Sequence, residues 1–138
     1  MPVIGVIDGQ GGGIGSHIIR NLRDNLPPEL DIVALGTNAV ATSAMMKSKA
    51  NRGASGENAI IQTVPTLNLI LGTLAIVIPN SMMGEITPKI AKAISSNQIP
   101  KILLPMKIAN VEIVGAGSEP LPHLINDMLA KVRVYLDI

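Results

Sequence analysis

The residues best suited to chemistry lie within the first sixteen positions. Asp8 follows an apolar run, and five of the next seven residues, at positions 9–15, are glycine. A segment with helical periodicity begins at Ser16. A strand, a glycine loop and a helix in this order direct backbone N–H groups and a helix N-terminus at an anion, usually a phosphate. We therefore predict that a phosphate-bearing ligand binds at residues 9–15, called the glycine loop below.

The spacing of the glycines narrows the class of ligand. Gly9, Gly13, Ile14 and Gly15 follow the pattern G-x-x-x-G-I-G, which is similar to the cofactor loop of short-chain dehydrogenases. That resemblance implies a nucleotide, such as NAD(P). The pattern is neither G-x-G-x-x-G nor a P-loop, because no Gly-Lys-Ser/Thr follows. The dehydrogenase pair Tyr-x-x-x-Lys is missing too, since the single tyrosine is Tyr135 and the chain ends at 138.

The alternative role for these glycines is a tight turn that lets a helix pack close to the sheet. Asp8 stands beside the predicted phosphate, and its charge would repel the phosphate unless a cation or hydrogen bonds compensate. If the loop binds a ligand, valine at Gly12 or Gly13 should block backbone approach and leave the fold largely intact.

Polar groups after other predicted strands complete the candidate site. Thr37 and Asn38 are predicted to contact a sugar, and Asn80 and Ser81 belong to the same edge of the sheet. The predicted cofactor-binding residues are Asp8, Gly9, Gln10, Gly11, Gly12, Gly13, Ile14, Gly15, Thr37, Asn38, Asn80 and Ser81.

Two other functions compete with ligand binding alone. A small enzyme on the same scaffold would use Asp8, Glu57 or Glu85 for acid–base or metal-assisted chemistry. A carboxylate with a raised pKa that faces the ligand would favour this enzyme, because a pure binder needs none. An interaction protein without a small ligand would use the glycines for packing alone.

The periodicity of the chain predicts the elements that must position these groups. Helices are predicted from Ser16 to the prolines at 27–28, from Asn38 to about Lys49, over residues 87–96 and from Leu121 onward. Strands are predicted at 2–7, 31–35, 59–64, 102–104 and, as an edge, 111–114, with 51–58 as a polar loop. Residues 68–78 fit either one strand or a strand to Leu71 broken at Gly72 and Thr73. Alternating strands and helices predict a single α/β domain over residues 1–138, a three-layer Rossmann-like sandwich with a mostly parallel sheet.

Composition restricts the partners. Hydrophobic residues make up 47% of the chain and the mean hydropathy is +0.41, which favours a homo-oligomer. A net charge of +1 and 1% aromatic residues argue against nucleic-acid binding. No cysteine is present and the two histidines lack metal-ligand spacing, so no metal site is predicted. No apolar stretch reaches the ~20 residues that a bilayer requires, and no leader is expected before the loop, so a cytoplasmic protein is predicted.

Several longer strings resemble a known family. They lie at residues 6–15, 34–38, 41–42, 56–59, 80–88 and 112–115. The whole chain resembles a family of small bacterial proteins, the domain of unknown function 3842. This resemblance implies that the polar loops form the site, and it implies no particular activity.

Overall fold

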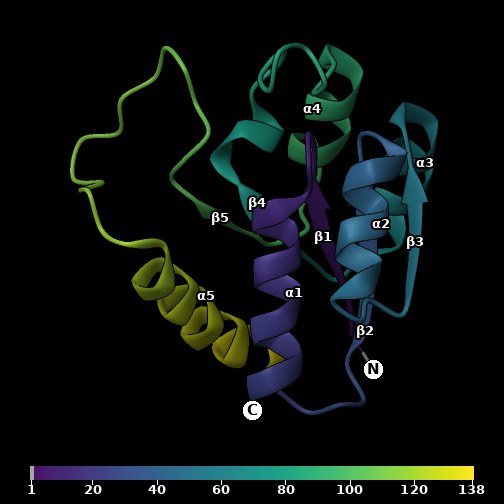
Figure 1. The fold of residues 1–138 in the computed structure, drawn as a ribbon, viewed down its shortest axis with the longest axis vertical. Helices are drawn as coiled ribbons and strands as arrows, with labels where there is room; N and C mark the ends of the chain where they lie inside the picture. Colours follow the sequence, from purple (N-terminus) through teal and green to yellow (C-terminus); the bar gives the residue numbers. More distant parts are fainter. Residues whose placement is uncertain (1) are drawn as a thin grey trace.

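The computed structural model describes residues 2–138, which form a five-stranded, all-parallel sheet covered by helices (Figure 1). The strands are β1 (Val3–Asp8), β2 (Asp31–Gly36), β3 (Arg52–Ser55), β4 (Leu69–Thr73) and β5 (Lys101–Leu104). The helices are α1 (Gly13–Asn25), α2 (Ala39–Lys47), α3 (Glu57–Thr63), α4 (Pro88–Ser95) and α5 (Leu121–Leu136), with short 3-10 turns η1 (Val64–Thr66) and η2 (Leu74–Val77).

Alternation along the strands divides the core into two layers. In β1, Ile4 and Val6 pack with α1, α2 and α5, whereas Ile7 packs with α3 and α4 on the opposite face. Successive side chains of a strand point to opposite faces, so a strand buried on both sides must be apolar throughout. The predicted three-layer α/β sandwich is confirmed.

The strand order places the glycine loop at the centre of one edge of the sheet. The order is β3-β2-β1-β4-β5, so the chain adds strands on one side of β1 and then crosses to add β4 and β5 on the other. In such sheets, ligands bind outside the carboxyl ends of the strands, at the point where the order of strand addition changes side. Here that point lies between the ends of β1 and β4, at Asp8 and Thr73.

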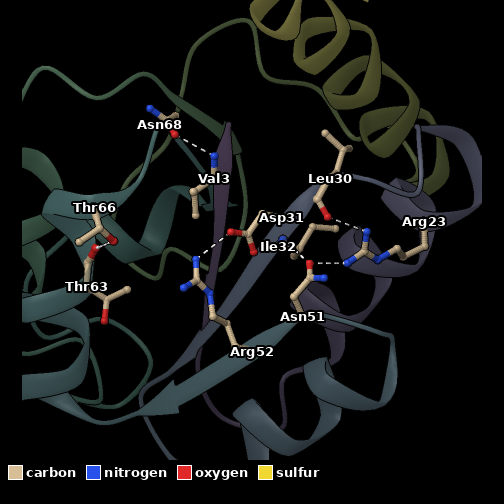
Figure 2. Close-up of polar contacts among 10 residues, drawn as sticks. All are labelled: Val3, Arg23, Leu30, Asp31, Ile32, Asn51, Arg52, Thr63, Thr66 and Asn68. Atoms are coloured by element: carbon tan, nitrogen blue, oxygen red, sulfur yellow. Dashed lines mark hydrogen bonds and ion pairs between the residues drawn. The ribbon is translucent and has the colours of Figure 1, made fainter. Parts of the chain in front are cut away.

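The predicted third strand is wrong. Residues 59–64 belong to α3 and η1, and the strand lies in the segment predicted as a polar loop, at β3. β3 pairs with β2 alone, and three of its four residues are exposed, so it needs no apolar pattern. Arg52 instead forms an ion pair with Asp31 of β2 at 2.8 Å (Figure 2). Ile60 and Val64, four residues apart, are the buried positions of the helical segment.

The predicted edge strand at residues 111–114 is also wrong. Among residues 2–138 this segment has no strand partner, and it lies in the long connection between β5 and α5, which extends away from the body of the molecule (Figure 1). Its β-branched side chains are exposed, and Val114 is fully so at 101%. β-branched composition alone does not make a strand when no neighbour pairs with the segment.

Two helix starts follow the predicted capping chemistry. The Asn38 side chain accepts from the Ala41 N–H at the start of α2, and Thr87 accepts from the Ile90 N–H before Pro88 at the start of α4. Residues 68–78 are broken, but not where predicted: Gly72 and Thr73 belong to β4, and the break comes after Thr73, where η2 follows. Within residues 2–138, no helix combines the length and apolarity needed to cross a membrane.

Candidate functional site

The glycine loop wraps around the carboxylate of Asp8. The Gly9 N–H donates to Oδ1 and the Gly15 N–H donates to Oδ2, each at 2.8 Å. The side chain is 1% exposed. Asp8 therefore occupies the inner position of the loop, where its negative charge faces the first turn of α1.

Asp8 experiences opposing electrostatic influences. Burial raises its pKa, the N–H donors of Gly15 and Gly9 and the charge of Lys107 lower it, and the charge of Glu85 raises it. The net result is a pKa above the ordinary value, because burial outweighs the donors. The repulsion expected between Asp8 and a phosphate is thus partly offset by two backbone donors and a nearby lysine.

Glu85 ties the loop to the end of β2. Its Oε1 accepts from the Gln10 N–H at 2.8 Å, the Thr37 hydroxyl at 2.6 Å and the Asn38 amide at 2.9 Å. Burial raises the pKa of Glu85, but these three donors and the charge of Lys107 outweigh it and hold the pKa below its ordinary value. A carboxylate kept ionised in this way is a fixed negative group beside the loop.

Three of the five loop glycines are explained by packing. A Cβ at Gly9 would lie 2.7 Å from the Thr37 hydroxyl, and one at Gly15 would lie 2.6 Å from the Met45 sulfur. Gly12 has φ +72°, and a Cβ there would lie 2.7 Å from the Ala41 carbonyl oxygen. The expectation that valine at Gly12 spares the fold is therefore wrong, because that side chain would meet the backbone of α2.

The other two glycines, Gly11 and Gly13, have no such explanation. Both are exposed, neither has a positive φ, and a Cβ at either would meet nothing within 4 Å. Gly13 and Ile14 are the first two residues of α1, where backbone N–H groups have no intrahelical acceptor. Among residues 2–138, the N–H groups of Gly11, Gly13 and Ile14 have no acceptor; we call them the outer N–H groups, in contrast to those of Gly9 and Gly15, which donate to Asp8.

A lysine ammonium lies beside the glycine loop. Lys107 follows β5, and its Nζ is 3.3 Å from the side-chain oxygen of Gln10. Its φ is +63°, a left-handed backbone conformation that is uncommon for a residue other than glycine. An ammonium at this place could neutralise a phosphate held by the outer N–H groups.

The remaining predicted residues are placed at different distances from the loop. Thr37 and Asn38 lie beside it, and the Asn38 amide also donates to the Gln10 carbonyl at 3.0 Å. Asn80 and Ser81 instead shape the turn before Glu85: the Asn80 N–H donates to Ile86 O, and the Ser81 hydroxyl donates to Ala75 O. Within residues 2–138, no hydrogen bond joins either residue to the glycine loop.

Two further residues complete the placement. Glu57 begins α3 after β3, two strand positions from β1, which separates it from Asp8 by about 10 Å of sheet. Thr73 was not predicted as a site residue. This residue, at the end of β4 beside β1, is 1% exposed, and its buried hydroxyl has no hydrogen-bond partner within residues 2–138. In the sequence, Thr73 is a single threonine at the end of an apolar strand. Sequence alone cannot tell whether such a residue belongs to a site or only packs in the core.

Among residues 2–138, no group of three or more His, Asp or Glu side chains is placed to hold a metal ion.

Comparisons with known proteins identify the family. The family model described as Domain of unknown function (DUF3842) matches residues 3–137, which confirms the resemblance found in the sequence. No curated protein matches the chain. One similar solved structure is a dodecameric FMN-dependent UbiX-like decarboxylase from Escherichia coli O157:H7, at 9% identity and a TM-score of 0.47, with 100% of this chain and 95% of that chain covered.

Proposed function

We propose that this chain, which belongs to the DUF3842 family, binds a small molecule that carries a phosphate, of the nucleotide or dinucleotide class. The phosphate accepts from the outer N–H groups of the glycine loop, at Gly11, Gly13 and Ile14. The observation that carries the proposal is that Gly11 and Gly13 are glycines where packing does not require glycine. A bare backbone lets a ligand approach more closely than any side chain would allow.

The position of Asp8 fits this arrangement. Its carboxylate already uses the inner N–H groups of Gly9 and Gly15, so a phosphate binds on the outer side of the loop. Lys107, whose Nζ lies 3.3 Å from the side-chain oxygen of Gln10, supplies a positive charge near the loop. The phosphate and the carboxylate then lie on opposite sides of the same backbone.

The sugar contact is reassigned among the predicted residues. Thr37 and Asn38 donate to Oε1 of Glu85 and thereby hold this carboxylate in place. Within residues 2–138, no hydrogen bond engages its second oxygen, Oε2. We propose that Oε2 accepts from the hydroxyls of the sugar, with Thr37 and Asn38 positioning it.

A catalytic role has less support than binding. The pKa of Asp8 is raised, as an acid–base group would require, but both of its oxygens accept backbone N–H groups and the side chain is 1% exposed. A group enclosed in this way holds the loop and does not reach a ligand on the outer side. We therefore propose binding without an assigned reaction.

Self-association remains part of the proposal. Val134, Tyr135 and Ile138 at the end of α5 are exposed by 79%, 57% and 52%. Apolar side chains gathered on one helix end support an interface between copies of the chain. Sedimentation equilibrium would test this, and a monomer at all concentrations would contradict it.

A thermal-shift screen tests the binding proposal. The panel contains AMP, ATP, NAD, NADP, FMN, coenzyme A, a sugar phosphate and inorganic phosphate, each with and without Mg²⁺. A ligand at 100 times its Kd should stabilise the fold by about 2.7 kcal/mol, a shift of several degrees for a chain of this size. Gly13→Val should remove the shift while keeping the melting temperature of the free protein, because its side chain points into open space. A folded Gly13→Val protein that binds as tightly as wild type, or no shift with any compound, would overturn the proposal.

A further inference from the structure

A basic groove runs between α1 and α2 on the outer face of the molecule. It has a volume of about 660 Å³ and is lined by Ser16, Arg20, Arg23, Asp24, Ala44, Lys47, Ser48 and Lys49. Four of these side chains are cationic and one is acidic, whereas the whole chain has a net charge of +1. The groove therefore concentrates positive charge that the rest of the chain does not share.

One of these cations is held in place. Arg23 donates from Nε to Lys49 O at 2.8 Å, from Nη1 to Leu30 O at 3.0 Å and from Nη2 to Asn51 Oδ1 at 2.6 Å. Figure 2 shows the guanidinium directed at Leu30 and Asn51. Its acceptors are uncharged, so the positive charge at this end of the groove is not neutralised. A guanidinium has five N–H donors, so two remain available.

The other cations are unpaired. Among residues 2–138, the side chains of Arg20, Lys47 and Lys49 have no hydrogen bond and no ion pair. The ion pair present in this part of the chain joins Arg52 to Asp31 and does not involve the groove. The groove holds one carboxylate, Asp24, for four cations, so the repulsion among the cations is only partly offset and a further anion would be stabilised there.

The groove is aligned with the glycine loop. Gly13, Ser16 and Arg20 recur at three- and four-residue spacing, so they share one face of α1. Seven residues separate Gly13 from Arg20, which corresponds to about 10 Å along the helix axis. An extended ligand with one end at the loop can therefore place a second group in the groove.

We propose that the groove between α1 and α2 is an anion-binding site, and that the natural ligand carries a second anionic group there. Arg20 and Lys47 bind this group from the two helices, and Arg23 provides a fixed positive field. The second half of this inference rests on the proposed function, whereas the groove itself can bind an anion independently. The ligand class is thus narrowed to nucleotides or dinucleotides that carry a second phosphate or other anion, separated from the first by an extended spacer.

The test compares fructose 1,6-bisphosphate with fructose 6-phosphate by calorimetry. Wild type should bind the bisphosphate about tenfold more tightly or better, because two charge-assisted contacts are added. Arg20→Gln with Lys47→Gln should remove this preference and leave the affinity for the monophosphate within about twofold. The matched control, Lys89→Gln with Lys92→Gln, removes the same charge from α4 on the other face of the sheet and should change neither affinity.

The outcomes separate this inference from the proposed function. Four results would overturn the proposed two-anion ligand. Wild type could bind the two sugars equally or bind neither, the Arg20 and Lys47 variant could keep the preference for the bisphosphate, or the control variant could lose that preference as well. Tripolyphosphate is then measured in Gly13→Val, in which the loop site is blocked: its binding should be kept there and lost when Arg20→Gln and Lys47→Gln are added. Tripolyphosphate binding unchanged by the Arg20 and Lys47 substitutions overturns the groove as a site. Unchanged monophosphate affinity in Gly13→Val instead overturns the proposed function.

Discussion

Alanine at Gly13 should make the fold more stable and its phosphate binding weaker. The residue is helical, and an added Cβ meets nothing within 4 Å. Alanine restricts the unfolded chain more than glycine does, which stabilises the native state by about 0.4–1 kcal/mol. For a chain of this length, we expect a rise in melting temperature of roughly 1–4 °C.

Gly15→Ala provides the matched contrast within the same loop. Its Cβ would lie 2.6 Å from the Met45 sulfur and 2.9 Å from Cβ of Asp8, so the core must shift. Overpacking of this kind costs about 1–3 kcal/mol. The two substitutions are chemically identical and two residues apart, yet their effects on stability should have opposite signs.

Urea unfolding followed by circular dichroism measures both effects, and calorimetry with the best ligand of the screen measures affinity. We expect Gly13→Ala to raise the free energy of unfolding and reduce affinity, because a methyl group stands where the phosphate approaches. A Gly13→Ala protein that is less stable than wild type by more than about 0.5 kcal/mol would refute the reasoning, since surface changes normally stay within that range. It would show that packing requires this glycine.

Other perturbations test the remaining contacts. Glu85→Ala removes the oxygen that accepts hydrogen bonds from Gln10, Thr37 and Asn38. It should lower the free energy of unfolding in urea by about 1–2 kcal/mol, less than the loss of a fully buried acceptor, because water can reach the three donors. An unchanged free energy of unfolding would show that this cluster does not hold the loop. The pKa of Glu85 is lowered in the fold, so the ionised carboxylate stabilises the protein above the unfolded pKa of 4.5, and this stabilisation is lost as pH falls through the folded pKa. Glu85→Gln should reduce the loss of stability at acid pH. A variant whose stability depends on pH as wild type does would contradict this prediction. The pKa of Asp8 is raised in the fold, and a bound phosphate should raise it further. The affinity for the phosphate should therefore fall as pH rises through that pKa, and binding should take up protons. Calorimetry in two buffers measures this uptake, and its absence would show that Asp8 and the phosphate do not interact. Thr73→Val replaces a buried, unpartnered hydroxyl by a methyl and should stabilise the fold by about 1 kcal/mol, whereas destabilisation would reveal an ordered partner such as water.

The sequence predicts the central part of this fold well because burial there imposes a pattern. β1, β2 and β5 are apolar runs, and the caps at Asn38 and Thr87 have side chains that satisfy free N–H groups. β3 escapes prediction because an exposed edge strand of four residues depends on the register of its neighbour. Such a strand has no periodicity that a sequence window can detect.

The candidate site is predictable in its residue types and not in its contacts. The glycines, Asp8, Thr37, Asn38 and Glu85 all stand out in the sequence. Their pairing does not, because residues up to 75 positions apart meet at one carboxylate. The sequence also cannot separate Gly12 and Gly15, which packing requires, from Gly11 and Gly13, which it does not.

The carboxylate enclosed by the glycine loop has a consequence for how a bound ligand could be sensed. Asp8 and Glu85 hold the loop through its own backbone, so its shape is set before any ligand arrives. Little ordering entropy is lost on binding, and association should proceed without a slow rearrangement step. A loop that keeps its shape cannot transmit occupancy by moving. Ligand binding would instead change the charge beside Lys107, which lies near the start of the long connection between β5 and α5.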